Sequence, residues 1–248
     1  MREAFFVISS KGILVGAPRL EPRIRSTAAS PPSRSVKAVP FGGNLILRQE
    51  SIKALLRTLS ARDPYTGHHS NRVTNIALAL ARSLGLPSHD LETLTNAGYL
   101  HDIGKIGISD SILLTPGPLT HKEREVIETH PLIGEKIVEP LGFNSQERDL
   151  ILLHYERWDG AGYPHGLEGN SIPFLSRLLA LADVFDALTS DRPYRQAFTT
   201  ADALAVIEVQ AGRQFDPDLT RKFVQVVKNL EPRTLCQIPF PPWLEGDW

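Results

Sequence analysis

The chain has little of the chemistry that stabilises secreted or membrane proteins. Its single cysteine, Cys236, excludes a disulfide within the chain and is typical of a protein kept in a reducing compartment. No apolar run approaches the roughly 20 residues that a membrane-spanning helix needs. The net charge is -1 over 248 residues, so the chain lacks the positive excess of a general nucleic-acid binder. We therefore expect a cytoplasmic protein with no membrane span and no DNA partner.

Changes in composition divide the sequence into three parts. Residues 1–44 hold two short apolar runs around a turn-like stretch, which predict a small hairpin, and then a basic linker rich in proline and serine. Residues 45–232 place apolar side chains at helical spacing. Residues 233–248 contain three prolines, which disfavour regular structure. We predict an N-terminal segment, one catalytic domain and a proline-rich tail.

The central part is predicted to be all-helical. Apolar faces and helix-breaking residues indicate one helix that ends before Asp63, one that ends at Gly85, and others over 87–101, 120–138, 145–155, 173–189, 200–210 and 217–229. The glycine-rich residues 159–171 predict an irregular loop. The expected fold class is an all-α helical bundle, with a site between helices that this loop covers.

Six ionisable residues fall at predicted helix ends or on apolar faces, where a charge is costly to bury. They are His69, His101, Asp102, His130, His154 and Asp183. The intervals after Asp102 are 28, 24 and 29 residues, about one helix-turn-helix step each, so a bundle could bring all six together. Imidazole and carboxylate ligands favour iron, manganese, zinc, cobalt or nickel. Two such metals roughly 3.5–4 Å apart can clamp a phosphate oxygen, which suits phosphoester cleavage.

Each feature also has a simpler interpretation. The adjacent pair His101-Asp102 could be a surface pair, and Asp183 could be a buried aspartate that is hydrogen-bonded without a metal. Lys105 follows His101 by four residues, so on a helix the two side chains would share one face. The metal hypothesis gains its weight from the six residues taken together.

Two motifs resemble the signatures of HD-GYP domains, a branch of the HD metal-dependent phosphohydrolases. They are His101-Asp102-Ile103-Gly104-Lys105 and Asp159-Gly160-Ala161-Gly162-Tyr163-Pro164. Further matching segments lie in the same order over about residues 48–230, among them Asp63-Pro64-Tyr65-Thr66, His130-Pro131-Leu132-Ile133-Gly134 and Ala182-Asp183-Val184-Phe185-Asp186. The resemblance implies an HD-type helical bundle that hydrolyses the bacterial second messenger cyclic di-GMP to pGpG or GMP.

The resemblance also implies a role for each matching residue. One metal would be bound by His69, His101, Asp102 and Asp183, and the second by Asp102, His130 and His154. Asp102 would bridge the metals and a metal-bridging hydroxide would attack phosphorus, with Lys105 stabilising charge on the leaving oxygen. The substrate would be bound by Lys105, Gly162, Tyr163, Pro164, Arg192 and Arg195. The expected cofactors are two divalent ions, iron or manganese.

The chain departs from the family pattern at Tyr155, where a second histidine is usual. A phenol is a poor ligand at neutral pH because its pKa is about 10. Family members with a third metal carry a glutamate where this chain has Tyr65, so two metals are predicted here. His68 competes with His69 as the first ligand, but the spacing to Arg72 favours His69.

Two other functions stay open at this point. A weakened domain could bind cyclic di-GMP or a partner protein without turnover, as the change at Tyr155 suggests. An HD phosphohydrolase could also act on another cyclic dinucleotide. The expected partners are cyclic di-GMP, a GGDEF-type or other signalling protein, and a second copy of the chain in a homodimer.

Overall fold

The computed structural model describes residues 5–9, 12–16, 45–114, 119–191 and 196–229. The predicted linker and the proline-rich tail lie outside these residues. Near the start of the chain, β1 (Phe5–Ser9) pairs in antiparallel fashion with β2 (Gly12–Gly16). The predicted hairpin is therefore present.

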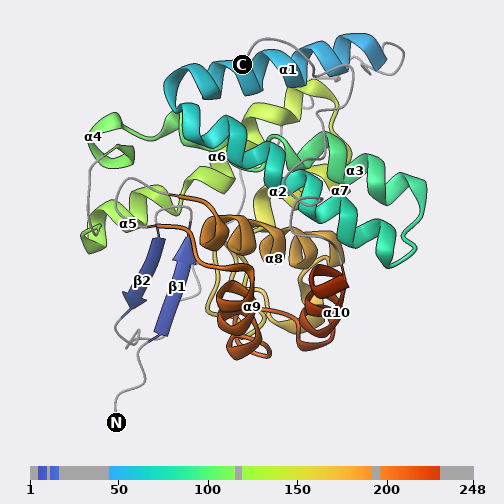
Figure 1. Cartoon of the computed structure of the whole chain (residues 1–248). Helices are drawn as coiled ribbons and strands as arrows, with labels where there is room; N and C mark the ends of the chain where they lie inside the picture. The colour runs from blue at the N-terminus through green and yellow to red at the C-terminus, as the bar shows by residue number, and fades with distance from the viewer. Residues whose placement is uncertain (1–4, 10–11, 17–44, 115–118, 192–195, 230–248) are drawn as a thin grey trace.

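From residue 45 onward the regular elements of the described chain are helices, and the predicted all-α bundle is confirmed (Figure 1). The longer α-helices are α1 (Leu45–Arg62), α2 (Pro64–Ser83), α3 (Ser88–Gly98), α6 (His130–Val138), α7 (Ser145–Leu153), α8 (Phe174–Thr189), α9 (Thr200–Val209) and α10 (Pro217–Asn229). The shorter elements are α4 (Asp110–Leu113), α5 (His121–Ile127) and the 3-10 turns η1 (Ile103–Gly107), η2 (Glu139–Leu141) and η3 (Gly169–Ser171).

Helix α8 is the central helix of the bundle and contacts α2, α7, α9 and α10 (Figure 1). Its sequence is apolar at most positions, so side chains on nearly all of its faces are buried. Burial of a side chain such as Leu178 or Leu181 stabilises the fold by about 1.5–3 kcal/mol. Asp183 and Asp186 are also buried, and their three-residue spacing puts them on one face that needs polar or cationic partners.

The prediction of one continuous helix over 120–138 is wrong. Helix α5 ends at Ile127 and α6 begins at His130. Pro131 explains the break, because a proline has no backbone N–H and fits only the first turn of a helix. The break puts His130 at the start of a helix, and its side chain is buried.

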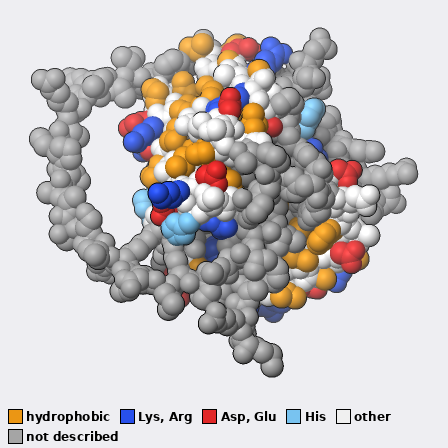
Figure 2. Space-filling model, turned by 90° about the vertical axis from the view of Figure 1, so that its left-hand side faces the viewer, with side chains coloured by type: hydrophobic (Ala, Val, Ile, Leu, Met, Phe, Trp, Pro, Cys, Tyr) orange, Lys and Arg blue, Asp and Glu red, His pale blue; other side chains and the backbone are white. Residues whose placement is uncertain are grey.

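The face that carries α4 and α5 shows hydrophobic side chains interspersed with acidic and basic ones (Figure 2). Leu114, Val126 and Leu132, in or next to α4, α5 and α6, remain exposed. Within the described residues, every helix is too short or too polar to cross a bilayer.

Candidate metal centre

The six predicted ligands come from five separate places in the bundle, and the structure brings all of them together. His69 lies on α2, Asp183 lies on α8, and His130 is the first residue of α6. His101 and Asp102 occupy the turn between α3 and η1, and His154 caps the end of α7. All six residues are at most 3% exposed. The surface-pair interpretation of His101-Asp102 is therefore wrong.

Three of the histidines are oriented by the backbone in the same way. The Nδ1 atoms of His101, His130 and His154 lie 2.7, 2.7 and 2.8 Å from the carbonyl oxygen three residues earlier. A carbonyl oxygen only accepts, so each Nδ1 carries the proton and donates it. Each Nε2 then offers a lone pair, and all three Nε2 atoms are buried without a hydrogen bond to any described residue. These atoms are suited to accept a metal ion.

The Asp102 carboxylate lies in the middle of the histidines. Its Oδ1 is 3.4 Å from His130 Nε2 and 4.0 Å from His154 Nε2. Its Oδ2 is 3.6 Å from His101 Nε2 and 3.9 Å from His69 Nε2. The two oxygens thus face different histidines, as a carboxylate placed between two cations would require.

Gly104 explains how Asp102 comes so close to His130. A Cβ atom at position 104 would lie 1.8 Å from the carbonyl oxygen of His130 and 2.6 Å from the amide nitrogen of Gly134. Only glycine lets η1 pack directly on the backbone of α6. The turn that carries two candidate ligands is therefore held against the helix that carries a third.

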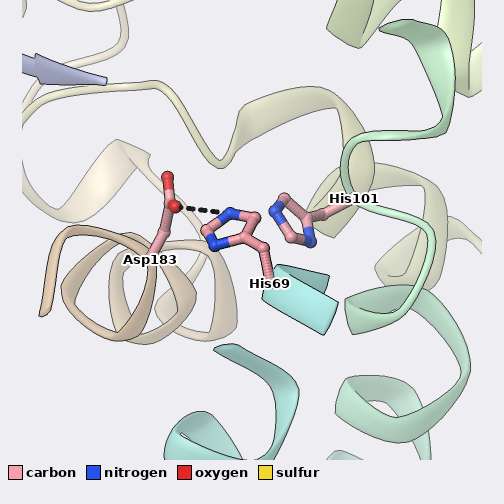
Figure 3. Close-up of side chains that lie close together, drawn as sticks. All are labelled: His69, His101 and Asp183. Carbon is pink, nitrogen blue, oxygen red and sulfur yellow. Dashed lines mark ion pairs between the residues drawn. The ribbon is translucent and has the colours of Figure 1, made fainter. Parts of the chain in front are cut away.

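His69 is held between two carboxylates of α8. Its Nε2 lies 3.1 Å from Asp183 Oδ1, and its Nδ1 lies 2.7 Å from Asp186 Oδ2. Arg72 donates hydrogen bonds to both oxygens of Asp186 and fixes that carboxylate. Figure 3 shows the His69 ring between Asp183 on one side and His101 on the other.

The pKa values of Asp102, His101 and His154 favour the protonation states in which these side chains bind metals. Burial alone would raise the pKa of Asp102, but the charges of Lys105 and His101 outweigh it and hold that pKa well below the usual range. Burial lowers the pKa of His154 well below its ordinary value, and neighbouring imidazoles lower it further. Burial also lowers the pKa of His101. An ionised carboxylate and neutral imidazoles are the ligand forms of these side chains.

His69 behaves differently because of its two carboxylate neighbours. Burial lowers its pKa, but hydrogen bonds to Asp183 and Asp186 outweigh burial and raise the pKa to about 9. Burial would raise the pKa of Asp183, but the hydrogen bond from His69 lowers it to about 2. A proton on His69 thus balances the acidic pair, and a metal cation would displace that proton.

The ligand atoms form two groups that share His101. One group is His69, His101 and Asp183, and the other is His101, Asp102 and His154; within each, the ligand atoms lie within 4.8 Å of one another. The family resemblance implies that His101 binds the first metal alone, whereas the geometry includes His101 in both groups. The mixture of imidazole and carboxylate fits divalent transition metals, as do the buried Nε2 atoms of His101, His130 and His154, which lack a hydrogen bond to any described residue.

Lys105 is buried near the same centre, but its contact differs from the expected one. Lys105 lies in the 3-10 turn η1 rather than in an α-helix, so the four-residue spacing does not put it on the same face as His101. Its ammonium group donates to Asp102 Oδ2 instead. The guanidinium of Arg62 donates to the carbonyl oxygens of Lys105, Ile106 and Ile108 and fixes the turn.

Residues 159–168 form an irregular loop, as predicted, and η3 follows it. The loop places Tyr163 beside His130, with ring centroids 6.5 Å apart. The Tyr163 ring stacks on Tyr155, with centroids 4.9 Å apart and planes 10° from parallel. A Cβ atom at Gly162 would lie 2.4 Å from the amide nitrogen of Arg157. The loop therefore packs closely on its own chain at Gly162. Pro164 follows Tyr163 through a cis peptide bond.

The sequence profile of the HD domain family matches residues 53–219. The chain belongs to this family. This match and the relatives described next together confirm the prediction of an HD-GYP member.

Relatives of this chain are named as phosphodiesterases of cyclic dinucleotides. The cyclic di-GMP phosphodiesterase response regulator RpfG of Xanthomonas campestris is 43% identical over 175 residues, which are 68% of this chain and 45% of that protein. The 3'3'-cGAMP-specific phosphodiesterase 3 of Vibrio cholerae is 33% identical over 230 residues, 91% of this chain and 49% of that protein. This chain thus spans about half the length of these relatives.

A solved HD-domain structure shares the fold. The crystal structure of a cyclic GMP-AMP specific phosphodiesterase of V. cholerae (V-cGAP3) superposes with a TM-score of 0.56 at 26% sequence identity. The match covers 77% of this chain and 49% of that one. The helical arrangement around the candidate centre is therefore that of an HD domain.

Sequence reasoning overlooked three buried or half-buried residues of this HD domain. Asp186 fixes His69, Arg62 fixes the turn with Lys105, and Glu156 binds the loop backbone. Asp186 could have been found, because a second aspartate in an apolar helix carries the same burial cost as Asp183. The predicted phosphate-binding residues Arg192 and Arg195 lie outside the described residues.

Proposed function

We propose that this HD domain is a metal-dependent phosphodiesterase that hydrolyses cyclic di-GMP to pGpG or GMP. The observation that carries the proposal is the buried cluster of four histidines and two aspartates, whose inward atoms suit metal ions. Relatives named as cyclic di-GMP phosphodiesterases support the substrate class. We place the catalytic domain at residues 45–232.

The proposed cofactors are two divalent ions, iron or manganese. His69, His101 and Asp183 would hold one, and His130 and His154 the other, with Asp102 between them. Bound metals of this kind supply Lewis acidity and activate water for attack on phosphorus.

The remaining groups of the chain would bind and orient the substrate. Lys105, a buried cation next to Asp102, is suited to stabilise negative charge on the leaving oxygen. Tyr163 would contact a guanine base, with Gly162 and Pro164 setting the course of the loop. Arg192 and Arg195 stay predicted phosphate contacts, and cytoplasmic location, a GGDEF-type partner and a homodimer stay predictions from the sequence.

A second candidate substrate is 3'3'-cGAMP. The V. cholerae phosphodiesterase specific for it matches 91% of this chain, a larger share than the RpfG match covers. Both molecules are cyclic dinucleotides with the same type of phosphodiester, so the metal centre would treat them alike. Discrimination would depend on residues that contact the bases.

The test is hydrolysis of both substrates by protein purified without oxygen and loaded separately with iron and with manganese. Products are separated by chromatography and bound metal is counted. His69→Ala should lose metal and at least about a hundredfold of the activity, as expected for loss of a metal ligand. His68→Ala is the matched control, because His68 is adjacent but exposed.

The outcomes separate the candidate functions. Turnover of cyclic di-GMP well above that of 3'3'-cGAMP supports the proposal, and the reverse selects the second substrate. Tight binding of cyclic di-GMP at full metal loading without product would make the domain a receptor, as Tyr155 suggests. Full activity in the His69→Ala variant would contradict the metal centre itself.

A further inference from the structure

Glu156 binds the backbone of the loop that carries Tyr163. The side chain is 4% exposed, and its carboxylate accepts three backbone hydrogen bonds. Oε1 accepts from His165 at 2.7 Å and from Gly166 at 3.1 Å, and Oε2 accepts from Leu167 at 2.9 Å. A charged acceptor makes each of these bonds stronger than a neutral one would. The turn that follows Pro164 is thus held by a single side chain.

Tyr155 holds the same loop through its ring. It stacks face to face on Tyr163, and the backbone N–H of Tyr163 donates to the carbonyl oxygen of Tyr155 at 3.2 Å. The Tyr155 ring also meets two candidate metal ligands, with centroids 4.5 Å from His154 and 5.2 Å from His130. Tyr163 also lies edge-on to His130, with ring centroids 6.5 Å apart, so Tyr155 packs against both Tyr163 and the metal centre in one ring cluster.

These contacts lie next to each other in the sequence. Tyr155 and Glu156 directly follow His154, whose ring is fixed by the carbonyl oxygen of Ile151. The close approach of Gly162 to the backbone at 155–157 leaves no space for the loop to shift toward this segment. One short segment thus joins a candidate metal ligand to the loop that carries Tyr163.

We propose that Tyr155 and Glu156 are positioning residues that fix Tyr163 relative to the metal centre and so set the affinity for the cyclic dinucleotide. In this chain the tyrosine at 155 replaces a metal ligand of the family with an aromatic support for the loop. The proposal rests on the proposed function, because Tyr163 is taken to contact a substrate base.

The first variant is Glu156→Gln. The amide keeps the size of the side chain but turns one acceptor oxygen into a donor, which would face a backbone N–H. At least one buried hydrogen bond between this side chain and the loop is lost. We therefore expect KM for cyclic di-GMP to rise about tenfold, with kcat within about threefold of the original value.

Glu147→Gln is the matched control. Glu147 is buried to a similar degree, and it accepts hydrogen bonds from Asn96, Asn144 and Arg48, none of which belongs to the loop. Its loss should lower Tm without changing KM. An equal rise in KM in both variants, or no rise in Glu156→Gln, would overturn the positioning role of Glu156.

Amide hydrogen exchange provides a measurement that does not depend on turnover. In Glu156→Gln, exchange at residues 165–167 should accelerate, while exchange in α7 and α8 should stay slow. Unchanged exchange at 165–167 would show that Glu156 does not hold the loop. If the unmodified protein hydrolyses no cyclic dinucleotide, the proposed function fails, whereas the exchange result still decides whether Glu156 holds the loop.

Variants at Tyr155 test the second contact and remain informative if Glu156→Gln does not fold. Tyr155→Leu removes the stack and should raise KM several-fold more than Tyr155→Phe, which keeps the ring. Both should bind as much metal as the unmodified protein. Loss of metal in Tyr155→Phe would show that the phenol oxygen is a ligand and would overturn the positioning role.

Discussion

Replacing Gly104 by alanine should disrupt the metal centre through a backbone clash. The added Cβ would lie 1.8 Å from the carbonyl oxygen of His130 and 2.6 Å from the amide nitrogen of Gly134. Both atoms belong to a helix backbone, so neither can rotate away as a side chain would. The turn and α6 must separate by roughly 1 Å or more, which places the cost at the upper end for overpacking, about 3 kcal/mol.

The expected change is large enough to measure by thermal unfolding. For a domain of this size, about 3 kcal/mol corresponds to a fall in Tm of roughly 6–12 °C. The same separation would lengthen the 3.4 Å distance between His130 Nε2 and Asp102 Oδ1, so the variant should also bind less metal. Differential scanning calorimetry and metal analysis of the purified protein test both effects.

Gly134→Ala is the control for this experiment. Its Cβ would lie 3.1 Å from a methyl group of Ile151, which can shift, and 3.2 Å from the amide nitrogen of Gly104, a contact relieved by a few tenths of an ångström. Alanine also favours a helix over glycine by about 1 kcal/mol. We expect a net change within about 1 kcal/mol. The reasoning is refuted if Gly104→Ala unfolds within 2 °C (roughly the effect of 1 kcal/mol) of the unmodified protein, or if both variants are equally destabilised.

Three further predictions concern the same centre. Removal of metal with a chelator should lower Tm, and added Mn²⁺ should restore it, because buried ligand atoms lose their cation; a Tm insensitive to chelation would argue against bound metal. Arg62→Gln removes donors to the carbonyl oxygens around Lys105, so kcat should fall about tenfold or more in steady-state assays; an unchanged kcat would show that the turn holds without Arg62. Asp186→Asn should lower the pKa of His69 from about 9 in the metal-free protein, because the imidazolium loses a charged partner; an NMR titration that finds it unchanged would contradict this account.

The helical fold and the meeting of the six ligands could be predicted from the sequence because both depend on spacing along the chain. Helical periodicity locates α8, and an aspartate at 183 within it requires a partner. The helix break before His130 could also be predicted, since Pro131 favours the first turn of a helix over its interior. Apolar periodicity on both sides of Pro131 favours the continuous helix instead.

The contacts of Glu156 and Arg62 could not be predicted from the sequence, because one partner in each contact is a backbone atom. Any residue supplies an N–H or a carbonyl, so Glu156 and Arg62 carry no pattern that names their partners. The sharing of His101 between two ligand groups likewise depends on the turn after α3, which deviates from the helix assumed for that segment. Such details follow from tertiary structure rather than from periodicity.

The carbonyl partners of His101, His130 and His154 have a consequence for how metal ions enter. Each ring is locked in one tautomer and one rotation by an atom three residues before it, so the rings are ordered when the helices form. An incoming ion then does not need to immobilise these side chains, so its binding should cost little conformational entropy. Metal exchange in such a preorganised cage would be limited by access and by displacement of protons, rather than by rearrangement of the protein.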